Sequence, residues 1–270
     1  KEIILPREDI NVLAVCDLYE DRREASAKAV KEAKGNDPLC TADYHEVLAM
    51  KEIDAVVVPT SWADHLCIAI DAMKAGKYVA TEVGGAYSID ECWELVRTHE
   101  ETGVPCMMLE NCVYDFYELT TLNMAQQGLF GEVIHAEGAY IHNLAEFWDR
   151  YHDNWRLAFD QAHSGDVYAT HGLGPDCQVL NIHRGDRMDY LVSMATNSVV
   201  GLETAKKDMG ADTFANGDQT STMIRTVNGK TILLQHNVYT PRPYDRMYQV
   251  VGTKGYAEKY PYPGFAFEPE

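Results

Sequence analysis

The sequence predicts an α/β fold in which a Rossmann-type parallel sheet is followed by an α+β domain with a large open antiparallel sheet. Through residues 1–112, short apolar runs alternate with polar, helix-prone segments. Apolar strands that alternate with helices are typical of a parallel sheet covered on both faces. Through residues 113–270, longer runs alternate between apolar and polar residues, and two of them flank a hairpin turn. We therefore expect two domains, with limits at 1–112 and 113–270.

The composition is that of an ordinary globular protein with an acidic surface. The chain has 270 residues, of which 46% are hydrophobic and 24% are charged, and its formal net charge is −19. A negative surface repels phosphate backbones and anionic lipids, so we expect neither nucleic acid nor a membrane as a partner. No apolar run in the sequence approaches the length of a membrane span.

The spacing of cysteines and histidines predicts no disulfide framework and no metal site. The seven cysteines are scattered singly without CxxC pairs, and the histidines show no ligand spacing such as HExxH. Unpaired cysteines fit folding in a reducing compartment. The sequence does not fix the localisation: we expect a cytoplasmic protein, or one exported in folded form with a leader upstream of Lys1.

The elements of the first half follow from apolar runs and helix boundary residues. Ser88 and Glu91 form an S-x-x-E capping box, which predicts a helix that starts there and is stopped by Gly103. We expect strands at 11–16, 55–59, 78–81 and 104–109, and helices at 21–33, 44–50, 64–74 and 89–102. The segment between the first helix and residue 44 is expected to be a linker.

Ligands of such sheets bind beyond the carboxyl ends of the strands. Asp17 follows the first predicted strand, where an acid can accept from the 2′-hydroxyl of an adenosine ribose and would repel a 2′-phosphate. The competing interpretation of Asp17 is a helix N-cap. Arg22 and Arg23 are expected to face solvent. Because no GxGxxG turn precedes residue 11, we expect the first strand and its glycine-rich turn to lie upstream of Lys1.

The second half predicts a helix and several long strands. A helix at 116–127 is closed by Gly128, and a strand at 133–140 places Tyr140 on the face opposite His135 and Glu137. Further strands are expected at 190–195, 220–227, 230–239, 247–251 and 256–259. Asn228–Gly229 predicts a type I′ hairpin turn. The last residues show no clear element, which is compatible with a C-terminal continuation. An open sheet of this kind packs on helices or on another subunit, so we expect a homo-oligomer.

Tyr168 and His171 lie three residues apart, where we expect the chemistry. A glycine-rich turn at 172–175 follows them; Pro175 suits the first turn of a helix and Gly185 suits its end. A phenol and an imidazole held just before a helix N-terminus could move protons at a substrate hydroxyl. A tyrosine three residues before a histidine also occurs often by chance, and the pair would then be structural.

Several other polar residues have both a functional and a structural interpretation. Glu110 ends a predicted strand, and His142 lies beyond the end of another, which favours function for both. Tyr140 could belong to the core, and Arg156 could be an ordinary surface residue. Asp176 is expected to be a solvated or capping acid.

The layout resembles the Gfo/Idh/MocA oxidoreductases, which usually carry a Glu-Lys-Pro motif after the fifth strand of the dinucleotide domain. Here that place reads Glu82–Val83–Gly84, so the lysine that works at the oxidised hydroxyl is missing. The departures resemble glycoside hydrolase family 109, the NAD-dependent α-N-acetylgalactosaminidases. The motifs that carry this resemblance are WADH (62–65), EVGGA (82–86), CMMLEN (106–111), GLFGEVIHAEGAYIHNL (128–144), NWR (154–156), DVYATHGLGP (166–175) and NIHRGDR (181–187).

The resemblance implies a glycosidase that works by transient oxidation. NAD⁺ would take a hydride from C3 of the sugar, a base would remove the C2 proton, and the glycosidic oxygen would leave by elimination before water adds. It implies His171 at O3, Tyr168 at C2 or in an orienting role, and Tyr140 and His142 near the leaving group or the nicotinamide. It also implies substrate binding by Glu110 and Arg156 and cofactor contacts from Asp17, Thr60, Trp62, His65, Glu82, Val83 and Asn111.

Two alternatives stay open from the sequence. One is an NAD-dependent sugar or inositol dehydrogenase, which would release an oxidised product. The other is a non-catalytic protein that keeps the fold and binds a sugar or a cofactor. In each case the expected ligand is a small molecule or glycan.

Overall fold

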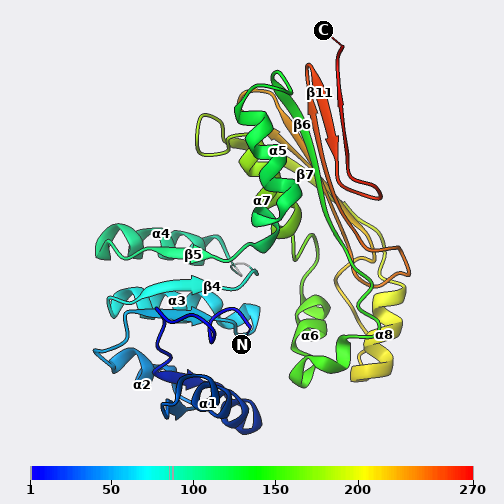
Figure 1. Ribbon diagram of the computed structural model, residues 1–270. Coiled ribbons are helices and arrows are strands. Elements are labelled where there is room, and N and C mark those ends of the chain that lie inside the picture. Colours follow the sequence, from blue (N-terminus) through cyan, green and yellow to red (C-terminus); the bar gives the residue numbers. More distant parts are fainter. Residues whose placement is uncertain (1, 85, 87, 270) are drawn as a thin grey trace. The chain divides into compact units, whose positions relative to one another are not determined.

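The computed structural model describes residues 2–84, 86 and 88–269 (Figure 1). The chain divides into two compact units, Lys1–Leu109 and Glu110–Glu270. The expected domain limits of 1–112 and 113–270 stay a prediction. Among the described residues, no helix has the length and apolar character needed to cross a membrane.

Unit 1 has the predicted α/β arrangement of short parallel strands and helices. Strands β1 and β2 pair in parallel, and β3, β4 and β5 form a second parallel sheet in that order. The elements are β1 (Ala14–Cys16), α1 (Glu20–Lys34), β2 (Leu39–Thr41), α2 (Tyr44–Ala49), β3 (Ala55–Val58), α3 (His65–Lys74), β4 (Tyr78–Thr81), α4 (Ile89–Thr102) and β5 (Cys106–Met108). Strand β2 replaces part of the expected linker, because three residues are too few to show a periodic pattern.

The boundaries of α4 show how local sequence positions the elements of unit 1. The Ser88 hydroxyl accepts from the Glu91 N–H at 3.2 Å, and the Glu91 carboxylate accepts from the Ser88 N–H at 3.0 Å, which confirms the capping box. Gly103 ends the helix in a left-handed conformation with φ 69°. The core beneath lies between α3 and its strands and consists of Val58, Ile68, Ala69, Ala72, Met73 and Val79.

Unit 2 is a seven-stranded sheet with α5 and α7 on one face (Figure 1). The strand order is β12-β11-β10-β6-β9-β8-β7. The elements are α5 (Phe116–Gln126), β6 (Val133–Ile141), α6 (Trp155–Ala162), α7 (Thr170–Val179), β7 (Met188–Ala195), α8 (Val200–Met209), β8 (Thr220–Thr226), β9 (Thr231–Asn237), β10 (Asp245–Gly252), β11 (Gly255–Glu258) and β12 (Gly264–Phe267).

The sheet is mixed, so the expectation of a purely antiparallel sheet was wrong in one pairing. β6 and β9 pair in parallel, with Tyr140 opposite His236, whereas the other neighbours are antiparallel. A period of two appears in both kinds of strand, so the sequence pattern could not separate them.

The hairpin between β8 and β9 is confirmed, but its turn is not type I′. That type needs positive φ at both central residues. Gly229 has φ 86°, whereas Asn228 is not among the residues with positive φ. Thr226 and Lys230 are joined by an N–H to carbonyl bond of 2.9 Å, so the loop has three residues and only Gly229 is left-handed.

Strand β12 was not expected, because prolines interrupt the pattern around it. It pairs with β11, and the Phe265 ring stacks on Tyr117 of α5 with centroids 5.0 Å apart. Phe267 contacts Phe130 at 5.5 Å between centroids. These aromatic contacts, rather than a visible alternation, hold the strand in place.

Helix α7 corrects the expected turn at 172–175. The helix runs through this segment, with Pro175 as its sixth residue, and it ends at Val179 well before Gly185. A Cβ on Gly172 would lie 2.5 Å from the Ala139 nitrogen. The glycine therefore serves close packing of α7 on β6. His171 consequently lies inside the first turn of the helix.

Candidate active site

In unit 1, the expected cofactor residues lie at the carboxyl ends of three strands. Asp17 follows β1, and its carboxylate accepts from the Tyr19 N–H at 3.0 Å. The Arg23 guanidinium donates to the carbonyls of Asp17 at 2.8 Å and Leu18 at 3.0 Å. The expectation that Arg23 faces solvent was therefore wrong, because backbone carbonyls hold its side chain beside the strand end.

Thr60, Trp62 and His65 follow β3 along one short segment. His65 is buried, and its Nε2 lies 3.0 Å from the Thr60 carbonyl oxygen. Trp62 is also buried, and a Cβ on Gly84 would lie 2.0 Å from the indole Cδ1. Only a glycine therefore fits at this position, where φ is 128°.

The segment after β4 carries Glu82, which is exposed, and Val83, which is buried. Gly85 of the EVGGA motif lies outside the described residues. Asn111 is exposed and belongs to unit 2, where it follows Glu110 at the start of a short 3-10 turn. The unit 1 residues thus offer exposed polar groups beside a packed tryptophan.

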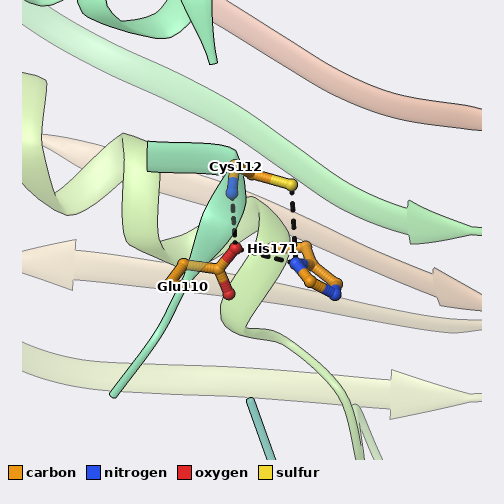
Figure 2. A group of neighbouring side chains, drawn as sticks. All are labelled: Glu110, Cys112 and His171. Atoms are coloured by element: carbon orange, nitrogen blue, oxygen red, sulfur yellow. Dashed lines mark hydrogen bonds and ion pairs between the residues drawn. The ribbon is translucent and has the colours of Figure 1, made fainter. Parts of the chain in front are cut away.

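In unit 2, Glu110, Cys112 and His171 form a buried cluster (Figure 2). The Glu110 Oε1 lies 2.7 Å from His171 Nδ1 and accepts from the Cys112 N–H at 2.9 Å. The Cys112 sulfur lies 3.4 Å from the same Nδ1. A Cβ on Gly174 would lie 2.9 Å from Glu110 Cγ, so the helix glycine makes room for the carboxylate.

The electrostatics of the cluster assign its protons. Burial alone would raise the pKa of Glu110, but the hydrogen bond and the charge of His171 outweigh burial and lower it. Glu110 is therefore ionised, and an ionised carboxylate only accepts. His171 Nδ1 therefore donates to this carboxylate, and in the uncharged form of the ring Nε2 is the nitrogen that can accept a proton. Burial raises the pKa of Cys112 to about 12, which keeps it a thiol.

Tyr140, His142, Tyr168 and His171 come together in one aromatic cluster. The Tyr140 ring stacks on His171 with centroids 5.5 Å apart and meets Tyr168 edge-on at 4.7 Å. The Tyr140 hydroxyl lies 3.4 Å from His142 Nδ1. The structure therefore groups all four expected catalytic residues within unit 2.

Two guanidinium groups lie over these rings. Arg156 is buried, with its Cζ 4.5 Å from the Tyr168 centroid and 5.5 Å from that of Tyr140. Arg246, on β10, lies 4.7 Å from the Tyr140 centroid and donates to the Tyr244 hydroxyl at 2.6 Å. Burial raises the pKa of both Tyr140 and Tyr168, although Arg156 acts in the opposite direction. Both phenols therefore stay protonated near neutral pH.

Sequence reasoning missed Cys112, Arg246, Tyr244 and His236. The local sequence around Arg246 resembles any strand, so its position became visible only in the fold. His236 lies beside Tyr140 across the sheet, with centroids 6.0 Å apart, and burial lowers its pKa to about 3. His236 is therefore neutral and adds no charge next to the Tyr140 ring.

Asp176 corrects another expectation. It is fully buried on α7, and neither carboxylate oxygen has a hydrogen-bonding partner among the described residues. It is therefore neither solvated nor a capping acid. Burial, with a smaller effect from Glu137, raises the pKa of this carboxyl well above its usual range.

Comparison with protein families decides the membership of this chain. Residues 114–263 match the model described as "Glycosyl hydrolase 109, C-terminal domain", which is more than half of the chain. The chain belongs to glycosyl hydrolase family 109. Residues 5–110 of this family 109 chain match "Oxidoreductase family, NAD-binding Rossmann fold", which confirms the expected dinucleotide fold of unit 1.

Individual relatives agree with this membership. The chain is 54% identical over 266 residues to "Glycosyl hydrolase family 109 protein 1" of Bacteroides fragilis strain YCH46, which covers 96% of this chain and 57% of the relative. It is 45% identical over 278 residues to "Alpha-N-acetylgalactosaminidase" of Bacteroides fragilis strain ATCC 25285, covering 97% of this chain and 65% of the relative. The chain thus spans little more than half the length of the first of these family 109 relatives.

Solved structures share the fold of this family 109 chain. One is scyllo-inositol dehydrogenase from Lactobacillus casei with NAD(H) and scyllo-inositol, with a TM-score of 0.70, 15% identity and coverage of 96% of this chain and 71% of that one. Another is the WlbA dehydrogenase from Bordetella pertussis in complex with NADH and UDP-GlcNAcA, with a TM-score of 0.70, 18% identity and coverage of 95% and 75%. These identities speak for the fold alone.

Proposed function

We propose that this chain carries the active site of an NAD-dependent glycoside hydrolase that cleaves α-N-acetylgalactosaminides. The observation that carries the proposal is the buried pair of Glu110 and His171 beside the phenols of Tyr140 and Tyr168. Membership of family 109 and 45% identity to a relative named alpha-N-acetylgalactosaminidase support it. The substrate would be a glycan or glycoside that carries the N-acetyl sugar.

His171 would act as the base. Glu110 Oε1 lies 2.7 Å from His171 Nδ1 and would accept the proton on that nitrogen, which fixes the ring with Nε2 left to accept a proton from the sugar. A carboxylate that orients an imidazole and supports its positive charge is a recurring arrangement in enzymes. Glu110 would then be a positioning residue, which narrows the role in substrate binding that the sequence implies.

Tyr168 and Tyr140 would act as proton donors rather than as bases. Burial raises the pKa of both phenols, so each hydroxyl keeps its proton and can donate to a sugar oxygen or to the departing one. The guanidinium of Arg156 lies over both rings and would hold an acyl or hydroxyl oxygen of the substrate. We keep His171 at the O3 hydroxyl. Once the O3 proton has passed to solvent, Nε2 of His171 would also take the proton from C2, while Tyr168 orients the sugar beside C2.

The residues of unit 1 fit a nicotinamide dinucleotide. Asp17 lies at a strand end with a half-buried carboxylate, and Thr60 and Glu82 expose polar groups after β3 and β4. Asp17 would accept from the ribose hydroxyls, with Thr60, Trp62, His65, Glu82 and Val83 as further contacts. The cofactor contact expected of Asn111, which belongs to unit 2, stays a prediction. The chemistry that NAD would supply when bound is reversible hydride transfer at the sugar ring, which makes the neighbouring C–H acidic.

The preference for NAD rests on the charge of Asp17. We expect Asp17→Ser to narrow the ratio of NAD to NADP affinity by about tenfold or more, because one repulsive charge near a 2′-phosphate is removed. Fluorescence titration of the purified protein with each cofactor measures the ratio. Asp21→Ser, on the exposed side of α1, serves as the control. Equal affinity of the wild-type protein for the two cofactors would contradict the assignment.

Turnover of an aryl α-N-acetylgalactosaminide tests the proposed reaction. We expect release of the aryl group without added NAD⁺ and without a net change in NADH absorbance. Accumulation of NADH without aryl release would overturn the glycosidase in favour of a dehydrogenase. A His171→Ala protein as active as the wild type would refute the site.

We also propose that the chain self-associates through the open face of its large sheet. Tyr190, Val192 and Met194 alternate along β7, Met223 lies opposite Val192, and all four side chains are exposed. A contiguous apolar surface of this kind is typical of a protein interface.

A further inference from the structure

Three atoms that commonly ligate metals converge in unit 2. Glu110 Oε1, Cys112 Sγ and His171 Nδ1 all lie within 4.8 Å of one another, and all three side chains are buried (Figure 2). Glu110 is the N-cap of a short 3-10 turn, Cys112 lies two residues further along it, and His171 comes from α7. No sequence spacing reveals the group, because 59 residues separate Cys112 from His171.

The donor set suits a borderline-soft divalent cation. Zinc binds thiolate, imidazole and carboxylate in a tetrahedron with bonds of about 2.0–2.3 Å, which places ligand atoms roughly 3.3–3.6 Å apart. Cys112 Sγ and His171 Nδ1 are 3.4 Å apart, which is within that range. Glu110 Oε1 lies 2.7 Å from Nδ1 and would have to move outward by roughly half an ångström or slightly more to share an ion.

The same set disfavours hard cations. Mg²⁺ and Ca²⁺ take six or more oxygen ligands, and this cluster offers a single carboxylate. Thiolate and imidazole favour zinc and its neighbours in the transition series. The chemistry of the three groups therefore selects the class of ion.

We propose that Glu110, Cys112 and His171 bind one Zn²⁺ ion, or a similar thiophilic divalent cation, and that the bound ion blocks proton transfer by His171. The first part of the proposal, binding of the ion, is argued from the geometry of the cluster alone. The second part, the block of proton transfer by His171, rests on the proposed function, in which Nε2 of His171 accepts a proton.

The protons and charges of this step balance. The ion takes the lone pair of Nδ1, and the Nδ1 proton moves to Nε2, so the imidazole stays neutral. Cys112 loses its thiol proton to solvent and becomes the thiolate ligand. Two positive charges on the ion then meet one carboxylate and one thiolate, which leaves the cluster neutral. Because Nε2 now carries a proton, His171 can no longer act as a base.

Titration of the purified, chelator-treated protein with Zn²⁺ against a chromophoric chelator tests binding. We expect one ion per chain, and with Co²⁺ as the probe a thiolate-to-cobalt charge-transfer band in the near ultraviolet. Cys112→Ser should remove that band and weaken Zn²⁺ binding by at least about tenfold, the lower end of the loss caused by changing even an outer-shell partner. Mg²⁺ should not compete.

Cys177→Ser is the matched control, because Cys177 is a partly buried cysteine of α7 outside the cluster. It should keep the charge-transfer band and the wild-type affinity. If Cys112→Ser fails to fold, as judged by near-ultraviolet circular dichroism, Glu110→Gln provides the second variant and should also weaken binding. Unchanged Zn²⁺ affinity in a folded variant, or no stoichiometric binding by the wild type, would overturn the proposal.

Inhibition of aryl release by Zn²⁺ tests the block of proton transfer separately from binding of the ion. In a protein that releases the aryl group, Zn²⁺ should stop release and a chelator should restore it. If the wild-type protein shows no aryl release under any condition, the proposed function fails while the binding titration still decides the metal site. If an active enzyme binds Zn²⁺ but is not inhibited, the claim that the ion blocks proton transfer by His171 is overturned.

Discussion

At the scale of single residues, the role of Glu110 is the most direct question that the site poses. Its carboxylate lies 2.7 Å from His171 Nδ1. If Glu110 positions His171, Glu110→Gln should lower kcat by about a hundredfold or more with little change in KM, because general-base catalysis is typically worth 10²–10⁴-fold. If Glu110 binds substrate, KM should rise instead. Steady-state kinetics on the aryl glycoside separates the two roles.

Asp189→Asn is the control for this measurement, because Asp189 is an exposed acid on β7 away from the cluster. It should leave both constants near their wild-type values. A Glu110→Gln protein with wild-type kcat and KM would contradict both roles.

Asp176 makes the stability of unit 2 depend on pH. Its folded pKa lies well above the value near 3.9 that we expect for the unfolded chain. Between the two pKa values the folded state therefore holds a proton that the unfolded state releases, so the contribution of Asp176 to stability is greatest at low pH and is lost as pH rises toward the folded pKa. The slope is about 1.4 kcal/mol for each pH unit within that window.

Asp176→Asn removes this titration without changing the shape of the side chain. We expect urea denaturation at a series of pH values to show that the variant gains on the wild type as pH rises from 5 to 8. Asp160 and Asp166, whose pKa values burial raises to about 6, titrate in both proteins, so the difference between the two isolates Asp176. Parallel pH curves for the two proteins would show that Asp176 does not carry the effect.

The sequence predicted one half of the active-site group and missed the other. Tyr168, His171, Tyr140 and His142 were expected from motifs, and the structure groups them. Arg246 was not expected, because an arginine within a strand has no distinguishing spacing. Its neighbours Met247 and Tyr248 have φ values of 58° and 51°. The strand is therefore irregular where Arg246 contacts Tyr140, and the sequence pattern does not predict this irregularity.

At the scale of elements, the contact between α7 and β6 positions His171. Gly172 and Gly138 meet backbone to backbone, and a Cβ on Gly172 would lie 2.6 Å from the Gly138 carbonyl carbon. Gly172→Ala must push the helix off the strand, since backbone atoms cannot rotate away. We expect a loss of about 1–3 kcal/mol in the free energy of unfolding and a lower kcat, because His171 moves with the helix.

Gly264→Ala is the matched control for Gly172→Ala. An added Cβ at Gly264 would meet no atom within 4 Å, and the residue begins an exposed strand. Chemical denaturation and aryl-release kinetics of the two variants make the comparison. Equal free energies of unfolding for the two variants would show that α7 can move away from β6 without loss of stability.

Elements were predictable where a local rule decides them. The capping box of α4 and the hairpin of β8 and β9 follow from a few neighbouring residues, and both are present. The glycines of α7 were interpreted as a turn because glycine is a poor helix former. Their tertiary contacts explain them: Gly172 packs on β6, and Gly174 packs on Glu110. In this helix a tertiary contact outweighs local propensity.

At the scale of the whole molecule, strand order was beyond the sequence pattern. The parallel pairing of β6 with β9 joins residues 96 positions apart in the chain, and it sets Tyr140 beside His236. Alternation of apolar and polar residues gives each strand a buried and an open face but does not name its neighbour. The fold class of each unit was therefore predictable from the sequence, whereas the position of His236 beside Tyr140 was not.

The open face of the same sheet yields a prediction about assembly. Met194 is 73% exposed and Val192 is 59% exposed, and both lie on the face of β7 that no described helix covers. If a second copy covers this face, a charge placed there must be buried without a partner on association, which costs several kcal/mol. The double variant Val192→Glu/Met194→Glu should therefore shift the protein toward monomers in light scattering coupled to size-exclusion chromatography. Ile89→Glu, an equally exposed apolar site at the start of α4, should leave the mass unchanged. A wild-type protein that runs as a monomer at micromolar concentration would refute this assembly, and so would a double variant that keeps the wild-type mass.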